Sequence, residues 1–299
     1  MAIEVVNLTE ADIPEAIEVI QHAFADDPYF KWVFNPAKFN KQRNYGSLEA
    51  RCRWGINNAI FQVAKESDGD DAPSRVLGVS CWLPPHPAAE PESWYSWAQS
   101  WLLSFRQFLN NVRHMGRGGL NTRRYWIWKD RQREAQSQIW DDPRGYYFCN
   151  IVAVSPEAQG KGIGKKLFQA VTDRADEEGV KCYLESSKEV PNVEIYRRMG
   201  FEMAKAMECR DGKDMCMVCL FPVGLLGVLL LTLLTFSCSC IAWSEIQSPS
   251  VKERQARSYC CGAAFTANGT IEMQRDYPRI EFRQPRSMIM NKVWGQYEY

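Results

Sequence analysis

The chain has 299 residues, which is long enough for one or two domains with a large hydrophobic core. Its 36 basic and 36 acidic residues balance, so the chain as a whole offers no electrostatic reason to bind nucleic acid or an anionic membrane surface. Aromatic residues make up 12% of the chain, a content that favours a packed globular protein over a disordered one.

The 11 cysteines show no spacing that is typical of a metal site. Cys216 and Cys219 form a CxxC pair, but the methionines and valine around them indicate a strand, and no second pair or nearby histidine completes a zinc set. We therefore predict no metal and expect buried free thiols in a reducing compartment. The first residues hold neither a basic region nor a long apolar run, so no secretory signal is predicted.

The first 84 residues predict strands and helices in alternation. Residues 3–7 are typical of a short strand, and Thr9 begins a capping-box pattern at the start of a helix. Apolar residues at helical spacing follow, and residues 41–59 predict a second helix. Residues 60–66 and 74–84 predict two strands of a hairpin, joined by the polar turn SDGDDAP.

Residues 85–143 have a different character. Two helical patterns lie there, separated by RGGL at 117–120, and the first pattern is rich in tryptophan and phenylalanine. We predict a helical insertion between the third and fourth strands. Two interpretations stay open: the aromatic residues add to the core, or the insertion forms a lid over a substrate.

The remaining pattern completes one domain. Residues 146–154, YYFCNIVAV, form a nearly continuous apolar run that suits a buried central strand. A glycine-rich loop and a helix follow in 155–179, then a strand at 181–187, a short helix at 191–200 and two final strands. The alternation predicts an α/β (α+β) domain over 1–220, with a mixed central sheet flanked by helices.

Residues 159–167, QGKGIGKKL, place three glycines at the start of a helix. Glycine backbone can approach a ligand closely and can adopt positive φ. The first turn of a helix has free N–H groups and the positive end of the helix dipole, so such a turn can bind phosphate. The stretch matches neither the P-loop nor the Rossmann pattern, and a plain tight turn is the alternative.

The stretch IVAVSPEAQGKGIGKKL resembles the acetyl-CoA-binding motif of the GCN5-related N-acetyltransferases, the GNAT family. The signature of that family is Gln or Arg, two residues, Gly, one residue, then Gly or Ala, and Gln159, Gly162 and Gly164 match it. Downstream, VPNVEIYRRMGF resembles the later segment of the family, in which Asn and Tyr precede a Gly-Phe pair. The resemblance covers residues 146–207, and the pattern of residues 1–84 is consistent with it.

The resemblance implies an N-acetyltransferase that transfers the acetyl group of acetyl-CoA to a primary amine by direct attack on the thioester. It also implies that the central strand splays from its neighbour, that the pantetheine arm pairs with the strand backbone, and that the pyrophosphate lies on the glycine turn. The cofactor-binding residues implied are Ile151, Val152, Ala153 and Val154 on the strand, Gln159, Gly160, Lys161, Gly162, Ile163, Gly164 and Lys165 in the turn, and Asn192 after it.

The resemblance also implies catalytic residues. Tyr196 matches the usual general acid, which protonates the CoA thiolate as it leaves; a core aromatic is the alternative interpretation. The central strand lacks the glutamate that some members carry as general base, so Glu185 on the next strand is the candidate. A water chain, or an amine that arrives neutral, would also serve. Other side chains considered for the base are Asp141, Asp142, His86 and His114.

Because the strand carboxylate is missing, a second function stays open: a non-catalytic module of the same fold that binds acyl-CoA or a partner. The acceptor under the first function is a small-molecule or peptide amine, and the sequence does not fix the length of the acyl chain. We expect no nucleic-acid partner, and nothing in the sequence indicates an oligomeric state.

The resemblance ends before residue 221. Residues 221–243 carry no charge, and as a helix they would span about 34 Å, enough for a hydrocarbon core of roughly 30 Å. We predict an apolar, membrane-spanning helix that anchors a cytoplasmic catalytic domain, with a buried helix or strand as the alternative. Residues 244–299 form a tail without a recognisable pattern. A third interpretation is that the whole region 221–299 comes from translated noncoding sequence.

Overall fold

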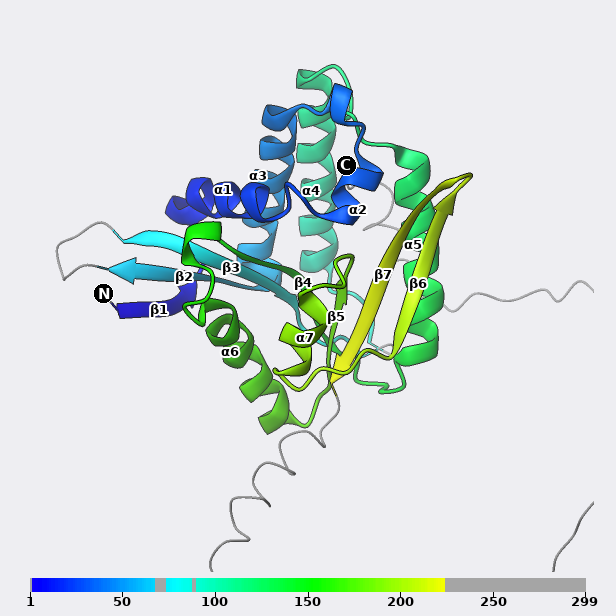
Figure 1. Ribbon diagram of the computed structural model, residues 1–299. Helices are drawn as coiled ribbons and strands as arrows, with labels where there is room; N and C mark the ends of the chain where they lie inside the picture. Colours follow the sequence, from blue (N-terminus) through cyan, green and yellow to red (C-terminus); the bar gives the residue numbers. More distant parts are fainter. Residues whose placement is uncertain (1, 68–73, 88–89, 224–299) are drawn as a thin grey trace, which may run out of the picture.

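The computed structural model describes residues 2–67, 74–87 and 90–223. Figure 1 shows one central sheet with helices on both of its faces. The sheet has seven strands in the order β1-β2-β3-β4-β5-β7-β6. β4 and β5 run parallel, whereas every other neighbouring pair is antiparallel. The predicted mixed sheet flanked by helices is therefore confirmed.

The elements follow the chain order expected from the sequence. The strands are β1 (Ala2–Asn7), β2 (Ile60–Ser67), β3 (Arg75–Leu83), β4 (Tyr147–Val154), β5 (Cys182–Ser186), β6 (Lys205–Asp211) and β7 (Asp214–Val223). The helices are α1 (Ile13–Ala23), α2 (Pro28–Val33), α3 (Lys41–Asn58), α4 (Trp94–Arg113), α5 (Thr122–Ile139), α6 (Ile163–Glu178) and α7 (Asn192–Arg197).

Local side-chain chemistry starts several of these helices. The predicted capping box is present: the Asp12 carboxylate accepts hydrogen bonds from the Thr9 backbone N at 3.0 Å and from its hydroxyl at 2.7 Å. At four further helices, a side-chain oxygen at the N-cap accepts from a backbone N–H three residues on. These N-caps are Asp27, Asn40, Ser93 and Asn121.

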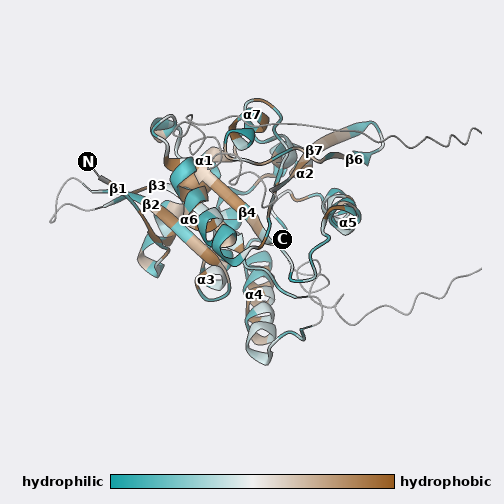
Figure 2. Ribbon diagram, turned by 90° about the horizontal axis from the view of Figure 1, so that it is seen from below, coloured by the Kyte–Doolittle hydropathy of each residue, from teal (hydrophilic) through white to brown (hydrophobic). Residues whose placement is uncertain are grey.

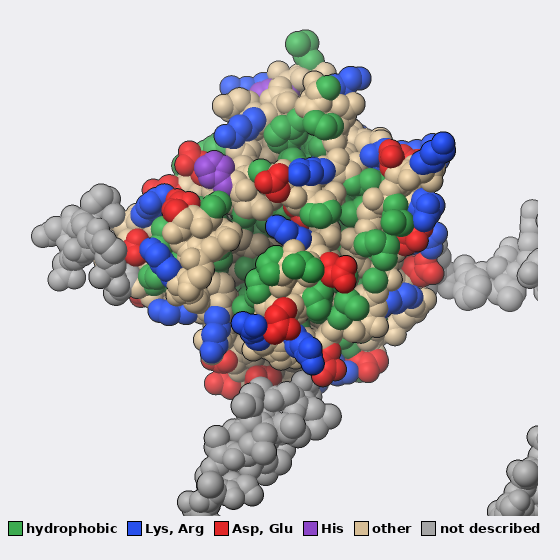
Figure 3. All heavy atoms as spheres, viewed as in Figure 1, with side chains coloured by type: hydrophobic (Ala, Val, Ile, Leu, Met, Phe, Trp, Pro, Cys, Tyr) green, Lys and Arg blue, Asp and Glu red, His purple; other side chains and the backbone are tan. Residues whose placement is uncertain are grey.

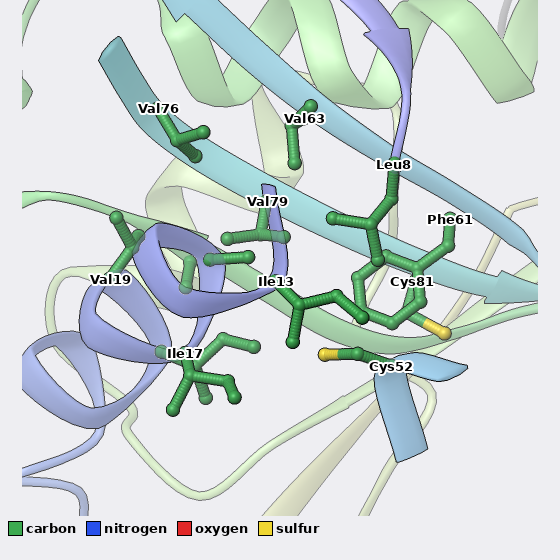
Figure 4. Packing of buried hydrophobic residues seen from close by; sticks show 13 residues of the cluster. Leu8, Ile13, Ile17, Val19, Cys52, Phe61, Val63, Val76, Val79 and Cys81 are labelled. Atoms are coloured by element: carbon green, nitrogen blue, oxygen red, sulfur yellow. The ribbon is translucent and has the colours of Figure 1, made fainter. Parts of the chain in front are cut away.

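The core lies on both faces of the sheet. Figure 4 shows one side, where Ile13 and Ile17 of α1 pack against Val63 of β2 and Val79 of β3. On the other side α6 covers the centre of the sheet, and its Phe168 meets Trp82 edge to face at 5.3 Å between ring centroids. The central strands are thus buried on both sides, which explains their nearly continuous apolar sequence.

The helical insertion lies between β3 and β4, as predicted, and consists of α4 and α5. α4 packs beside α3, whereas α5 packs beside β6 (Figures 1 and 2). One of the two interpretations, that the aromatic residues of the first insertion helix add to the core, is wrong. Trp97, Trp101, Phe105, Phe108 and Val112 are all exposed, because α4 turns its polar side toward α3.

The last strand of the sheet runs three residues past the boundary predicted at Leu220. β7 continues to Val223, and Phe221 is a fully buried strand residue paired with Leu184 of β5. The predicted apolar helix therefore does not begin at Phe221, since a short apolar run suits a buried strand as well as a helix. The rest of that helix and the tail lie outside the described residues. Among the helices that the structure does describe, none has the length and apolar character needed to cross a bilayer.

A close approach between β3 and α6 gives a test of this packing. A Cβ on Gly78 would lie 2.8 Å from Cγ2 of Ile163 and 3.1 Å from Cδ1 of Leu167. We expect Gly78→Ala to lower the free energy of unfolding by about 1–3 kcal/mol, because the added methyl overpacks this contact. Urea denaturation followed by circular dichroism measures the change. Gly164→Ala is the control, since its Cβ would lie 3.8 Å from Val154, at ordinary contact distance. Equal stability of the two variants would contradict the packing described here.

Candidate active site

The central parallel strands stay together over only a short distance. β4 and β5 pair at three positions and then part, so Asn150–Val154 of β4 have no strand beside them on that side among the described residues. On its other side β4 remains paired with β3, where the register shifts and leaves Asn150 as an extra residue. Such a bulge bends a strand. The bent, half-paired strand leaves backbone N–H and C=O groups at the edge of a gap.

The gap widens into a cavity of about 840 Å³. β4 and the end of β5 line its floor, and residues from α1, α2, α3, α5, α6 and α7 line its walls. Figure 3 shows one face of the molecule, on which basic and acidic side chains are interspersed, without a large area of one sign.

The glycine turn forms one end of the cavity. Gly160 and Gly162 have positive φ, 81° and 76°, and a Cβ at either position would meet no atom within 4 Å. Glycine is therefore required by the backbone conformation rather than by crowding. The Gly162 carbonyl accepts the first helical hydrogen bond, from Lys166 N at 3.1 Å. The N–H groups of the first turn of α6 consequently have no partner within the helix.

The structure places almost all of the predicted cofactor-binding residues around this cavity. Lys161 is the exception, because its side chain points toward β2, where Nζ lies 3.7 Å from the Glu66 carboxylate. The cavity-lining residues from the predicted set are Ile151, Val152, Ala153, Val154, Gln159, Gly160, Gly162, Ile163, Gly164, Lys165 and Asn192.

Tyr196 projects from α7 into the cavity wall. Its ring packs against Phe168 and Phe221, at centroid distances of 5.8 and 5.3 Å, and most of the side chain is buried. Burial raises the pKa of the Tyr196 hydroxyl, so the group keeps its proton at neutral pH. α7 itself is tied to the end of β5, because Asn192 Nδ2 donates to the Ser186 hydroxyl at 3.0 Å.

Glu185 lies on β5, where this strand leaves β4, and also lines the cavity. Three side chains donate hydrogen bonds to its carboxylate: Gln132 at 2.8 Å, Tyr183 at 2.9 Å and Gln136 at 3.3 Å. Burial raises the pKa of Glu185, and these hydrogen bonds oppose the shift. The two glutamines were not predicted; they lie one turn apart on α5, and the only sequence signal is their spacing of four residues.

The other candidate bases lie elsewhere. The Asp141 carboxylate pairs with Lys181 at 2.7 Å, and Asp142 pairs with Arg144 at 2.8 Å. Neither aspartate lines the cavity, and the same is true of His86 and His114. Cys149 of β4 does line the cavity, but burial raises the pKa of its thiol and disfavours the thiolate that a nucleophile or base would need.

Sequence reasoning missed a group of aromatic side chains that lines part of the cavity and that we call the aromatic wall. α2 and the residue after it contribute Tyr29, Phe30 and Phe34, and α5 contributes Tyr125 and Trp128. The rings of Tyr29 and Trp128 lie 5.0 Å apart and join the two helices. Among the described residues, no group of three or more His, Cys, Asp or Glu side chains could hold a metal ion.

Comparison with known proteins gives the same family throughout. Residues 121–203 match the model of the acetyltransferase (GNAT) domain. The chain is 27% identical over 199 residues to "Uncharacterized N-acetyltransferase C550.08" of Schizosaccharomyces pombe, covering 64% of this chain and 70% of the relative. It is 23% identical over 201 residues to "Uncharacterized N-acetyltransferase C56E4.07" of the same yeast, covering 64% and 78%.

Similar solved structures include one titled "histone acetyltransferase HPA2 and related acetyltransferase" from Corynebacterium glutamicum, with a TM-score of 0.43 and 19% identity. The match covers 74% of this chain and 96% of that chain. A polyamine N-acetyltransferase from Drosophila melanogaster has a TM-score of 0.44 and 14% identity, and the match covers 75% of this chain and 100% of that chain.

The matched region runs from α5 through α7 and contains the parting strands, the glycine turn and Tyr196. Sheet, turn and matched sequence together define an acetyltransferase domain. Over residues 121–203 the chain matches the GNAT family of acetyltransferases, and relatives named N-acetyltransferases align with 64% of its length.

The raised pKa of Glu185 makes stability depend on pH. Near pH 4 the carboxyl is largely protonated in both the folded and the unfolded chain; as pH rises past about 4.3, the unfolded chain ionises first. Glu185 therefore costs stability as pH rises, and Glu185→Gln should gain stability relative to wild type between pH 4 and 7. Urea unfolding across that range measures the gain. Glu189→Gln, at an exposed glutamate nearby, controls for loss of a charge. If the free energies of unfolding of wild type and Glu185→Gln differed by the same amount at every pH between 4 and 7, this would contradict the burial assigned to Glu185.

Proposed function

We propose that this protein is an acetyl-CoA-dependent N-acetyltransferase that acts on a primary amine. One observation carries the proposal: β4 and β5 part after three paired positions, and the gap leads to a glycine turn at the start of a 16-residue helix. A strand edge and a helix N-terminus in one cavity suit a ligand with an extended amide-bearing arm and a phosphate group. Acetyl-CoA has both.

The pantetheine arm would lie along Ile151–Val154. The arm carries two amides, which can pair with a strand edge in the manner of an added strand. Asn192 would contribute a side-chain amide from the opposite side of the gap. Side-chain identity along β4 matters little for such pairing, since the backbone makes the contacts.

The pyrophosphate would lie on the N–H groups from Gln159 to Lys165. Positive φ at Gly160 and Gly162 turns the backbone at this point, and the dipole of α6 favours an anion at its N-terminus. The turn is fixed from beneath, because Ser155 N donates to the Leu77 carbonyl at 2.8 Å and Ile163 is fully buried. A fixed turn can bind the anion without reorganising.

The aromatic wall and Glu185 would form the acceptor side. The amine, a small molecule or part of a peptide, arrives largely protonated, and Glu185 would take its proton directly or through water. The amine nitrogen then attacks the thioester carbonyl carbon and gives a tetrahedral intermediate with a positive charge on nitrogen. As the intermediate collapses, the C–S bond breaks, Tyr196 gives its proton to the departing sulfur, and the nitrogen loses its extra proton, which returns to the Tyr196 phenolate through water, so that the products are a neutral amide and CoA thiol. The raised pKa of each group suits its role: it makes Glu185 a stronger base than an exposed carboxylate and keeps Tyr196 protonated.

The catalytic domain would extend over residues 1–223, three residues beyond the predicted boundary. Use of acetyl-CoA supports a cytoplasmic location for this domain.

Binding of CoA tests the placement of the pyrophosphate. We expect Gly162→Val to weaken acetyl-CoA binding by about ten-fold or more, since a β-branched residue disfavours the left-handed backbone that aims the N–H groups. Lys161→Gln is the matched control: its side chain points toward Glu66, so binding should change by less than about three-fold. Isothermal titration calorimetry measures both. Equal affinity of Gly162→Val and wild type would remove the turn from the binding site.

Turnover tests the chemistry. Wild-type protein, acetyl-CoA and a panel of small amines, polyamines and peptides should give an acetylated amine that mass spectrometry detects. Tyr196→Phe should lower kcat by about 100-fold with little change in acetyl-CoA affinity, because only the proton for the leaving sulfur is lost. Binding without product from any amine would favour a non-catalytic acyl-CoA module, and full turnover by Tyr196→Phe would exclude its role as acid.

A further inference from the structure

α4 has its apolar side outside and its polar side inside. Six large apolar residues recur at steps of three or four along the helix and, at about 100° per residue, fall within an arc of about 80°. We call them the α4 apolar face: Trp94, Trp97, Trp101, Phe105, Phe108 and Val112. All are exposed, Trp94 to 80% and the other five to at least half. A contiguous apolar stripe of this length on a helix surface marks a site of interaction.

Hydrogen bonds on the buried side hold the helix in this orientation. Gln107, fully buried, accepts from the Ser47 hydroxyl at 2.9 Å and donates to the Ser47 carbonyl at 3.0 Å. One turn on, Asn110 donates to the Arg43 carbonyl at 2.8 Å. Rotating α4 to bury its tryptophans would break these bonds and leave buried polar groups without partners. The exposed face is therefore built into the fold.

The chain segment that contains this face carries charge of one sign. Residues 93–129 contain six basic residues and no acidic residue, although the whole chain is neutral. Arg123 and Arg124 are paired with Asp211 of β6. The exposed side chains of Leu109, Leu102 and Tyr95 extend the apolar surface by about 80° beyond the arc, and Arg113 and Arg106 lie at the end of this extension. Arg117 follows the helix. None of these three arginines takes part in an ion pair within the described part of the chain.

We propose that the α4 apolar face binds a lipid bilayer with anionic headgroups. A helix that presents Trp and Phe on one side, with arginines at its margin, can lie in the plane of the bilayer interface. The arginines then meet lipid phosphates or carboxylates. A second copy of the chain suits the face less well, because two α4 helices would bring their arginines together without a carboxylate in residues 93–129 to pair with them.

Vesicle binding by the full chain tests the proposal, with the apolar residues 221–243 present in every variant. The probes are vesicles of phosphatidylcholine alone and of phosphatidylcholine with 30% phosphatidylserine, at low and high salt. Wild type should sediment with the anionic vesicles, and its tryptophan emission should shift to the blue. The triple variant Trp94→Ser, Trp97→Ser, Trp101→Ser should bind at least about ten-fold more weakly. Arg106→Gln with Arg113→Gln should lose the preference for anionic lipid.

Control variants test whether vesicle binding depends on the α4 apolar face or on another part of the chain. Met203→Ser and Met215→Ser remove exposed apolar side chains far from α4 in the sequence and should leave vesicle binding unchanged. The triple variant should keep the circular dichroism spectrum and acetyl-CoA affinity of wild type, because none of its positions lines the cavity. Equal vesicle binding by wild type and the triple variant would overturn the proposal and assign binding to 221–243. Absence of vesicle binding, with a dimer of wild type that the triple variant abolishes, would overturn it in favour of a second copy.

Discussion

The short parallel pairing of β4 with β5 is the constraint on which the rest of the site depends. Three paired positions hold the two halves of the sheet together, and the parting beyond them opens the cavity. The extra residue in β4 bends the strand at the same point. A longer pairing would close the gap and leave the glycine turn without a ligand path. The fold therefore gives up hydrogen bonds at its centre where the proposed chemistry needs an accessible backbone edge.

The groups proposed for catalysis are positioned by elements that end at this gap. Glu185 belongs to the strand that diverges, and Tyr196 belongs to the helix that follows it. Both are held from behind: Glu185 by glutamines of α5, and Tyr196 by aromatic rings of α6 and β7. The insertion helix α5 thus supplies the glutamines that hold Glu185, whereas Glu185 itself lies on a strand of the central sheet. Burial raises the pKa of both groups.

The sequence predicted the features that depend on local pattern. The capping box at Thr9, the hairpin, the helical insertion and the glycine turn follow from neighbouring residues, and the structure has all four. Features that depend on distant contacts were missed. The donors Gln132 and Gln136 meet Glu185 only through the packing of α5 beside the sheet, and the end of β7 at Val223 depends on pairing with β5. The exposed face of α4 was also missed, because helical periodicity indicates one apolar side but not which way that side points.

Hydrogen–deuterium exchange of the full chain, with and without acetyl-CoA, tests the central claim most directly. The account predicts slower exchange on binding at the backbone amides of 151–154 and 159–165, with smaller changes in α4, β1 and β6, which lie away from the cavity. Free CoA should protect the same amides, because the arm and the pyrophosphate are common to both ligands. Unchanged exchange along β4 and the turn, or protection that appears only in other elements, would contradict the assignment of the gap between β4 and β5 as the acyl-CoA site.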